Sequence, residues 1–183
     1  SPAASNFAGS GSTYTFDVIP SSDGTVIIDI PAASAIDIAA NPNNAATQFT
    51  ITSDTIAPTP IITSTQGASG SSTSAATINF TVNFGESVSG FNATGITVTG
   101  TASGGSPAAS NFAGSGSTYT FDVIPSSDGT VIINIATAAA IDIAANPSNA
   151  ATQFTITSDT IAPTPIITST QGASGSSTSA ATI

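Results

Sequence analysis

Apolar and polar residues alternate along most of this chain, and an apolar residue at every second position is typical of a half-buried β-strand. The clearest example is the segment TINFTVNF at residues 77–84, in which Ile78, Phe80, Val82 and Phe84 share one face. A spacing of 3.6 residues, which would indicate an amphipathic helix, does not recur. The pattern therefore predicts an all-β protein.

Seven alternating segments follow one another within about 100 residues. The segments predicted as strands are residues 60–64, 77–84, 95–99, 111–113, 118–124, 130–135 and 152–157. The Ala-rich run IATAAAIDIAA at residues 135–145 is the one stretch that could form a helical turn, and we assign it to the last connection between strands. Seven short strands without crossover helices predict an immunoglobulin-like Greek-key β-sandwich.

The chain repeats itself at an offset of 105 residues. Residues 1–78 match residues 106–183, and 73 of these 78 pairs are identical. The differing pairs are Asp29/Asn134, Pro31/Ala136, Ala32/Thr137, Ser34/Ala139 and Asn43/Ser148. This period is too long for a solenoid unit and close to one sandwich domain of about 100 residues. The sequence therefore predicts tandem sandwiches.

The stretch TSDTIAPTP occurs at residues 52–60 and again at 157–165, and we predict that it links consecutive repeats. One complete repeat then spans residues 54–158. Residues 1–53 correspond to the C-terminal half of a preceding repeat, and residues 159–183 to the N-terminal start of a further one. We expect the sequence to be a window on a longer tandem array.

Charge narrows the partners and activities that the chain can have. All ten charged side chains are acidic, nine Asp and Glu86, and Lys, Arg and His are absent. Nucleic acids and anionic membrane surfaces are recognised through Lys and Arg, so neither is an expected partner. No apolar run approaches the ~18 residues of a membrane span, so membrane insertion is not expected. Without a basic side chain or Cys, we predict no catalytic residue and no enzyme.

Several segments resemble the tandem bacterial Ig-like repeats of large surface adhesins and biofilm proteins. They are DTIAPTPIITST, FTVNFGESVSGF, ITVTG, STYTFDVIPSSDGTVIINI and IDIAANPSNAATQFTIT. The resemblance spans a whole repeat and implies an extracellular or cell-surface location. Family members usually have an acidic residue followed by Ala-Gly-Asn in the loop before the last strand. Here Asp142 is followed by IAAN, and Ala145 in place of Gly disfavours a positive φ at that position.

Antiparallel strand order predicts which carboxylates meet at a junction between repeats. Counting strands from the linker places Asp54, Glu86 and Asp142 at the same pole of the complete sandwich. A turn of the preceding repeat brings Asp23 to the same junction. At the next junction Asp128 and Asp159 are the corresponding residues.

Like charges that converge without a cation of their own repel one another, and bound Ca²⁺ would neutralise them. Ca²⁺ takes six to eight oxygen ligands, and Asn146 with backbone carbonyls of residues 143–147 would complete the shell. The resemblance implies the same ion, since related adhesin repeats often stiffen their linkers with Ca²⁺. The alternative is that each Asp is a solvated turn residue that bonds its own backbone. The sequence leaves both interpretations open.

Three functions fit these observations. The first is a structural spacer in an extracellular adhesin or fibre, with neighbouring repeats of the same chain as partners. The second is a subunit of an extracellular filament, in which identical chains join by strand exchange or edge pairing. The third is a glycan- or surface-binding module, for which the sequence shows no pocket signature.

Overall fold

The computed structural model describes residues 3–102, 109–177 and 179. The described residues are almost entirely strands, turns and extended segments, and the one helix is a single 3₁₀ turn, η1 (Ala93–Gly95), capped by the side chain of Asn92. The protein is all-β, as the alternating pattern predicts. The Ala-rich run at residues 135–145 leads into the last connection between the long strands, as predicted, and contains turns and the short strand β13 (Ile141–Asp142) rather than a helical turn.

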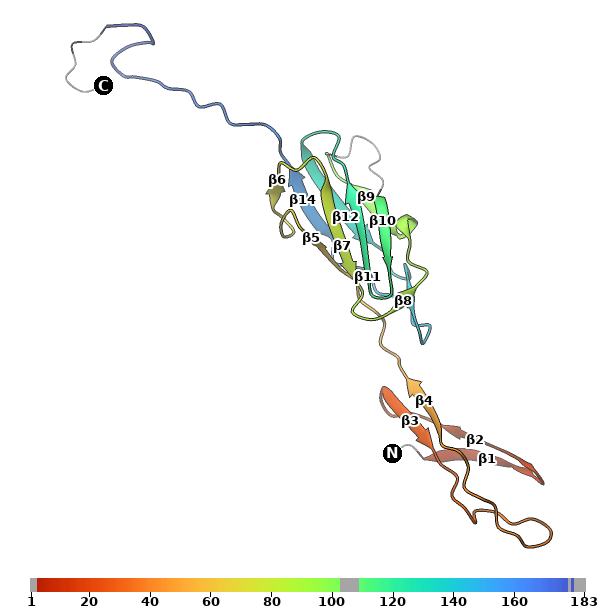
Figure 1. The fold of residues 1–183 in the computed structure, drawn as a ribbon. Coiled ribbons are helices and arrows are strands. Elements are labelled where there is room, and N and C mark those ends of the chain that lie inside the picture. Colours follow the sequence, from red (N-terminus) through yellow and green to blue (C-terminus); the bar gives the residue numbers. More distant parts are fainter. Residues whose placement is uncertain (1–2, 103–108, 178, 180–183) are drawn as a thin grey trace.

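A closed β-sandwich occupies the middle of the chain (Figure 1). One sheet has the order β10 (Ser110–Ser115), β11 (Thr118–Val123), β7 (Ile78–Asn83) and β5 (Ile61–Ser64), with every pair antiparallel. The other has the order β6 (Ser72–Thr73), β14 (Phe154–Ser158), β12 (Gly129–Ile135) and β9 (Ile96–Thr99). Its β6–β14 pair is parallel, and its other pairs are antiparallel. This division of strands between two sheets is that of an immunoglobulin-like sandwich.

The seven longer strands of this sandwich correspond to the seven predicted segments. Three strands of two residues were not predicted: β6, β8 (Val88–Ser89) and β13. Strand β6 carries the chain from the first sheet to the edge of the second, where it pairs with β14. Strands β8 and β13 pair with each other and close one end of the sandwich.

The core fills the space between the two sheets with the inward-facing residues of the alternating segments. Phe80 stacks on Phe121 within one sheet, with ring centroids 5.0 Å apart, and meets Phe154 of the other sheet edge-on at 5.6 Å. Ile78, Val82, Phe84 and Tyr119 are likewise buried. Each such side chain contributes roughly 1.5–3 kcal/mol of burial free energy, so this repeat has an independent core.

The strands before residue 54 form two separate hairpin-like pairs. Strand β1 (Ala4–Ser10) pairs with β2 (Thr13–Val18), and β3 (Gly24–Ile28) pairs with β4 (Phe49–Ser53). The 105-residue offset makes them counterparts of β10, β11, β12 and β14. After β14, the described residues from 159 onward contain no strand and leave the sandwich at the end opposite to the linker (Figure 1).

Candidate functional site

The junction between the first two pairs of strands and the closed sandwich is the candidate site. The connecting residues 54–60 run from the end of β4 to the start of β5. Asp23 lies in the turn between β2 and β3, and its Oδ1 accepts hydrogen bonds from Thr55 N (3.0 Å) and Thr55 Oγ1 (2.8 Å). The carboxylate of Asp54 accepts a bond from Ile56 N at 3.0 Å. The first residues of the linker are therefore fastened to the preceding half-repeat.

The last residues of the linker are fastened to the sandwich that follows. Asn149 donates its backbone N–H to Pro58 O and its side-chain amide to Thr59 Oγ1, both at 2.9 Å. Pro58 and Pro60 are fully buried. Because Pro has a fixed φ and no N–H to satisfy, it can be buried at a strand edge without an unpaired donor. Within the linker, residues 56–57 make no hydrogen bond to the half-repeat or to the described part of the sandwich. The linker therefore has little length in which it can bend.

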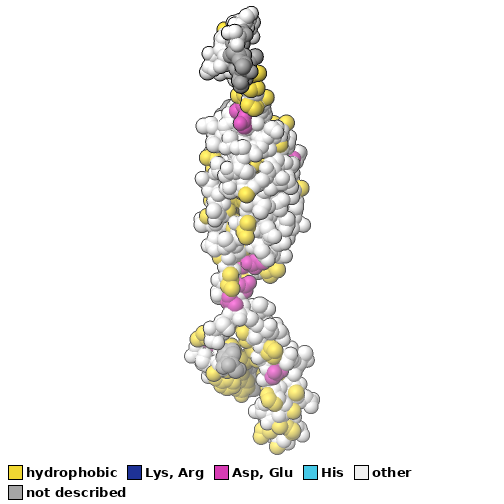
Figure 2. All heavy atoms as spheres, turned by 90° about the vertical axis from the view of Figure 1, so that its left-hand side faces the viewer, with side chains coloured by type: hydrophobic (Ala, Val, Ile, Leu, Met, Phe, Trp, Pro, Cys, Tyr) yellow, Lys and Arg dark blue, Asp and Glu magenta, His cyan; other side chains and the backbone are white. Residues whose placement is uncertain are grey.

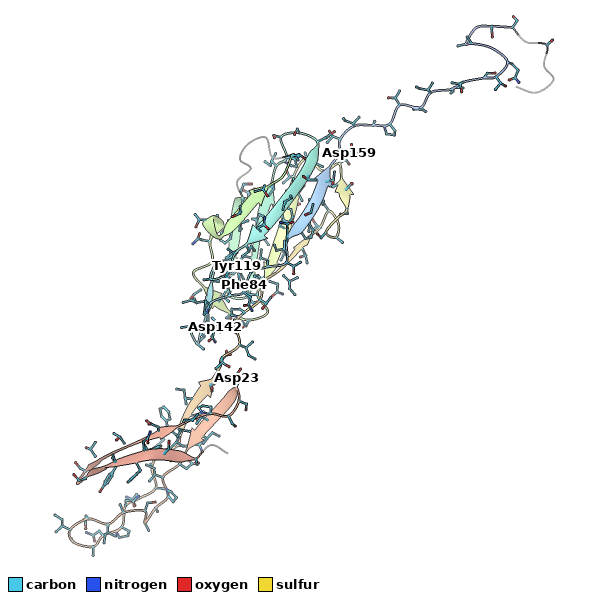
Figure 3. The ribbon with its side chains drawn as sticks, turned by 180° about the vertical axis from the view of Figure 1, so that it is seen from behind. Asp23, Phe84, Tyr119, Asp142 and Asp159 are labelled. Carbon is cyan, nitrogen blue, oxygen red and sulfur yellow. The ribbon has the colours of Figure 1, made fainter. Side chains whose placement is uncertain are left out.

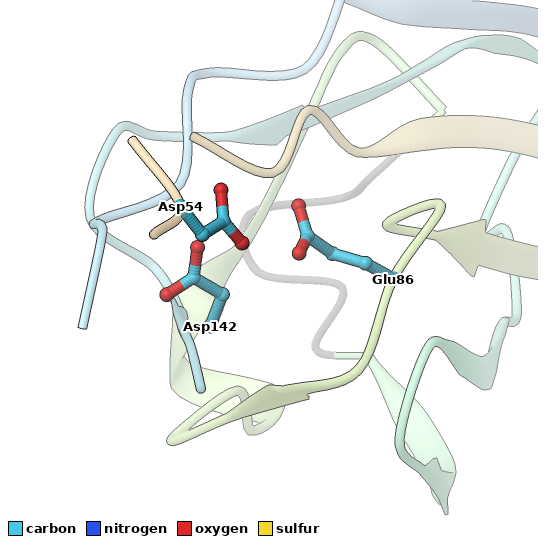
Figure 4. A group of neighbouring side chains, drawn as sticks. All are labelled: Asp54, Glu86 and Asp142. Atoms are coloured by element: carbon cyan, nitrogen blue, oxygen red, sulfur yellow. The ribbon is translucent and has the colours of Figure 1, made fainter. Parts of the chain in front are cut away.

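Three carboxylates converge where the linker meets the sandwich. Asp54 comes from the linker, Glu86 from the turn between β7 and β8, and Asp142 from β13, and one oxygen of each lies within 4.8 Å of the others. Figure 4 shows the three carboxylates facing a common space. Pairing of β8 with β13, in which Val88 lies opposite Asp142, brings the Glu86 turn next to the Asp142 loop. We call these three residues the acidic trio.

Aromatic packing supports the pole of the sandwich that carries the acidic trio. Tyr119 and Phe84 lie at this pole (Figure 3), and their rings meet edge-on with centroids 6.0 Å apart. Phe91 contacts both, at 5.1 Å from Tyr119 and 5.0 Å from Phe84. The Tyr119 hydroxyl donates to Val88 O at 3.3 Å, which ties β8 to the core. The loops that carry Glu86 and Asp142 therefore rest on a packed base.

Asp142 is held by Asn146, which lies four residues further along the chain. Asn146 N donates to Asp142 Oδ1 and Asn146 Nδ2 to Asp142 Oδ2, both at 2.8 Å. Asn146 Nδ2 also donates to the backbone oxygen of Asp54 at 3.1 Å, so one amide group joins the loop to the linker. Burial by itself raises the pKa of Asp142, but the bonds from Asn146 and the backbone N–H groups of Ala144 and Ala145 outweigh it and lower the pKa below 3.8.

Ala145 gives this loop its shape, and the structure corrects the expectation drawn from its sequence. Ala145 has a φ of +70°, and its counterpart Ala40 has a φ of +64°. The loop therefore keeps a left-handed residue although no Gly is present. The two backbone bonds that close the turn, Ala145 N to Asp142 O and Asp142 N to Asn146 O, hold Ala145 in this conformation. A non-Gly residue in this region costs about 1–2 kcal/mol.

Glu86 experiences the repulsion that the sequence predicts for an uncompensated acidic group. Desolvation, followed by the charges of Asp54 and Asp142, raises the pKa of Glu86 above 4.5. The chain contains no Lys, Arg or His that could form an ion pair with it. Within the acidic trio, hydrogen bonds therefore stabilise the charged form of Asp142. Desolvation and the neighbouring charges destabilise the charged form of Glu86.

The structure divides the predicted site residues into two sets. Asp54, Glu86 and Asp142 come together, and Asn146 donates hydrogen bonds to the carboxylate of Asp142 and to the backbone oxygen of Asp54. Asp23 is at the same junction (Figure 3), where its Oδ1 accepts hydrogen bonds from Thr55, and it is not one of the carboxylates in the trio. Sequence analysis did not identify Thr55 as a partner, although the repeated SDT triplet before the linker marks the position.

Asp159 lies at the opposite end of the sandwich (Figure 3), and Asp128 contacts the neighbouring Thr160. Acidic side chains are visible at both ends of the sandwich (Figure 2). At the end with Asp159, Thr160 N and Oγ1 donate to Asp128 Oδ1, and Ile161 N donates to Asp159 Oδ1. These bonds repeat those of the first junction although the described residues after 160 form no sandwich. We call the bonds from Thr55 to Asp23, and from Thr160 to Asp128, the Asp–Thr clasp. The clasp is therefore a property of the repeat that ends at the linker.

Comparison with known proteins found no matching family model, no matching curated protein and no matching solved structure. In the described part of the chain, no helix is long and apolar enough to cross a membrane. Oxygen ligands on three converging carboxylates suit a hard divalent cation such as Ca²⁺. The chemistry of the acidic trio therefore fits such an ion, and the hydrogen bonds of Asn146 show how part of the charge is stabilised without one.

Proposed function

We propose that this chain is a structural, non-enzymatic repeat of an extracellular adhesin or fibre, in which each sandwich is a stiff spacer. The observation that carries the proposal is the short linker fastened at both ends, with the chain entering the sandwich at one pole and leaving at the other (Figure 1). Repeats joined in this way extend along one direction. Their function is mechanical: each core resists unfolding, and each linker limits bending.

The residues present support this role over catalysis or binding of a polar ligand. Recognition of phosphate and nucleic acid depends on basic side chains, and the sequence contains no Lys or Arg. Apart from Asp122 on β11, the acidic side chains of the closed sandwich lie at its ends, and the outward faces of its strands carry mostly Ser, Thr and Asn. The resemblance to adhesin repeats favours an extracellular location for such a spacer.

We include Ca²⁺ in this proposal, bound by Asp54, Glu86 and Asp142. A cation there would bridge the linker to two loops of the following sandwich and remove the repulsion at Glu86. For an extracellular module of Kd ~10⁻⁴–10⁻³ M, 10 mM Ca²⁺ would add roughly 1.5–2.5 kcal/mol to the free energy of unfolding.

Electron microscopy of chains with increasing numbers of this repeat tests the spacer role. Strands of 6–8 residues rise ~3.3 Å per residue, so each repeat is expected to add very roughly 35–50 Å of contour length, with little bending at each linker. Compact particles, or a length that does not grow with repeat number, would contradict the proposal. For the cation, thermal unfolding in EDTA and in 10 mM Ca²⁺ is the direct measurement, and identical melting temperatures would exclude a bridging Ca²⁺.

A further inference from the structure

Strand β10 is the longest strand at a free edge of the closed sandwich. The edge strands are β10, with six residues, β5 and β9, with four each, and β6, with two. Among the described residues, no strand lies on the outer side of β10 (Figure 1). A free edge presents unpaired N–H and C=O groups that can pair with another chain. Pairing between copies would therefore be most extensive at β10.

A bulge interrupts β10 in its middle. The register with β11 shifts between Ser110 and Ala113. Two residues of β10, Asn111 and Phe112, therefore lie opposite a single residue of β11. Asn111 has a φ of +50°, a left-handed conformation that is uncommon for residues other than Gly. A bulge bends and twists its strand, and sheets use bulges to turn an edge away from other chains.

The side chain of Asn111 is bonded across the strand pair to Asp122. Asn111 Nδ2 donates to Asp122 Oδ2 at 2.8 Å, and Asn79 Nδ2 on β7 donates to the other oxygen, Oδ1, at 2.7 Å. Asn111 and, to a smaller extent, Asn79 lower the pKa of Asp122 below 3.8. A carboxylate accepts on both oxygens, so Asp122 can bind the two amides at once. The bulge is therefore tied to the middle of the sheet.

The same bulge and the same bond recur in β1 and β2. The register there shifts between Ser5 and Ala8, and Asn6 has a φ of +52°. Asn6 Nδ2 donates to Asp17 Oδ2 at 2.7 Å. In the described residues, no strand lies beside β2 as β7 lies beside β11. The bulge and its bond therefore need only the two strands that form them.

Packing of the core does not by itself require the bulge. Phe112 packs against the core from β10. Ser110 and Ala113 pair with outward-facing residues of β11, and residues opposite each other share a face. Without Asn111, a regular strand would place Phe112 opposite Phe121, on the same inward face. The extra residue therefore changes the edge of the sheet and leaves its inward residues the same.

We propose that Asn111 and Asp122 form an edge lock, which keeps β10 bulged and prevents the sandwich from pairing edge to edge with a second copy of this chain. Copies of one chain have identical edges, so each can serve as the partner of the other. Strand β10 itself, with the sequence SNFAGS, carries no charge that would oppose such pairing. The inference does not depend on the spacer role or on Ca²⁺.

Deletion of Asn111 tests the edge lock, because it restores a regular β10 with the same inward residues. The chain contains no Cys, so a single Cys in place of the exposed Ala113 reports contact between two β10 edges. The full chain is oxidised at about 0.1 mM in EDTA and about 0.5 M NaCl, which screens repulsion between the acidic chains. We expect disulfide-linked dimers to form at least about tenfold faster with the deletion than without it.

Asp122→Thr is a second unlocked variant, since it removes the acceptor of Asn111 without shortening the strand. We expect it to accelerate cross-linking through Ala113→Cys about threefold or more. Asp29→Asn removes the same charge at a distance from β10 and should leave the rate unchanged. Thermal unfolding followed by circular dichroism shows which variants keep the closed sandwich. If the deletion variant does not unfold cooperatively, Asp122→Thr decides the test.

Thr97→Cys on β9 locates the contact, because Thr97 is exposed on the edge of the other sheet. Its rate of cross-linking is expected to be the same with and without Asn111. An equal rise at Thr97→Cys and Ala113→Cys would overturn the proposal, since the copies would then associate without regard to the edge. Rates at Ala113→Cys that stay unchanged in the folded unlocked variants would overturn it as well.

Discussion

At the scale of single residues, Ala145 has a strained backbone conformation that the hydrogen bonds of its loop impose. Its φ of +70° is held by the turn that presents Asp142 and Asn146 to the linker. Gly adopts this conformation without a steric penalty. We therefore expect Ala145→Gly to increase the free energy of unfolding by about 1 kcal/mol and to raise the melting temperature by about 4 °C.

Thermal unfolding followed by circular dichroism checks this expectation. Ala144→Gly is the matched control, because its position is not among the residues with positive φ. There the added backbone freedom of Gly should leave stability unchanged or lower it by up to about 1 kcal/mol. Equal effects of the two substitutions would show that Ala145 is not strained.

Glu86 is the residue at which the repulsion within the acidic trio is expressed. In EDTA at pH 7, Glu86→Gln is expected to stabilise the closed sandwich by up to about 1 kcal/mol, since it removes a like charge beside Asp54 and Asp142. If Ca²⁺ binds the trio, the same substitution is expected to reduce the gain in melting temperature on adding Ca²⁺.

Asp29→Asn is the control for net charge, because the other copy carries Asn134 at the same position and Asp29 lies outside the trio. It removes one negative charge and should leave the melting temperature of the closed sandwich unchanged, both in EDTA and with added Ca²⁺. A loss of stability in Glu86→Gln in EDTA would contradict the assigned repulsion.

At the scale of elements, the sequence predicts the strands that alternate and misses those that depend on partners. Each of the seven longer strands has a run of inward apolar residues, which is a local signal. Strands β6, β8 and β13 have two residues each and form only because a partner lies beside them. Strand β6 pairs with β14, and β8 pairs with β13. The Ala-rich run forms turns and β13 rather than a helical turn, since Asp142 and Ser148 bond the backbone of that loop instead.

The same reasoning explains how much of the site could be predicted. Strand order alone gives the pole at which a loop lies, and on that basis Asp54, Glu86 and Asp142 were expected to meet, as they do. Strand order does not decide between competing hydrogen bonds. Asp23 reaches the expected junction but binds Thr55, and Asn146 acts as a donor to Asp142 through its amide.

The Asp–Thr clasp at the linker is an element of stiffness that can be removed. Asp23→Ala eliminates the acceptor for both Thr55 N and Thr55 Oγ1, so we expect the linker to bend more freely between the half-repeat and the sandwich. Pairs of spin labels on either side of the linker should report a broader distance distribution. The melting temperature of the closed sandwich is expected to change by less than about 1 °C, because neither residue contributes to its core.

Asp17→Ala is the matched control for this clasp, since Asp17 accepts a bond from Asn6 on the outer face of its strand pair. It removes the same charge at a distance from the linker and should leave the distribution unchanged. Equal broadening in both variants would assign the effect to charge, and no broadening in Asp23→Ala would assign the stiffness to the proline segment alone.

At the scale of the whole molecule, the uncompensated charge of −10 makes stability depend on pH in an unusual direction. The pKa of Glu86 is raised above 4.5 by desolvation and by Asp54 and Asp142, so its contribution to stability is present below that pH and is lost as the pH rises through its folded pKa. Self-repulsion of the remaining carboxylates acts in the same direction as the pH rises.

Hydrogen-bonded carboxylates act in the opposite sense at lower pH. The pKa of Asp122 is lowered below 3.8 by the side-chain amides of Asn111 and Asn79, and that of Asp142 is lowered by Asn146 against the effect of burial. Their contribution is present above 3.8 and is lost as the pH falls through their folded pKa values. Together the two sets place maximum stability between about pH 3.8 and 4.5 when no divalent cation is present.

Melting temperatures measured from pH 3 to pH 8 in EDTA are therefore expected to pass through a maximum near pH 4 and to fall toward neutral pH. Glu86→Gln should make the fall on the neutral side shallower without changing the acid side, because it removes only the group whose pKa is raised. Addition of 10 mM Ca²⁺ should also flatten the neutral side if the cation takes the place of the proton between the three carboxylates. Stability in EDTA that keeps rising to pH 7 would show that the acidic trio is solvated well enough to need neither a proton nor a cation.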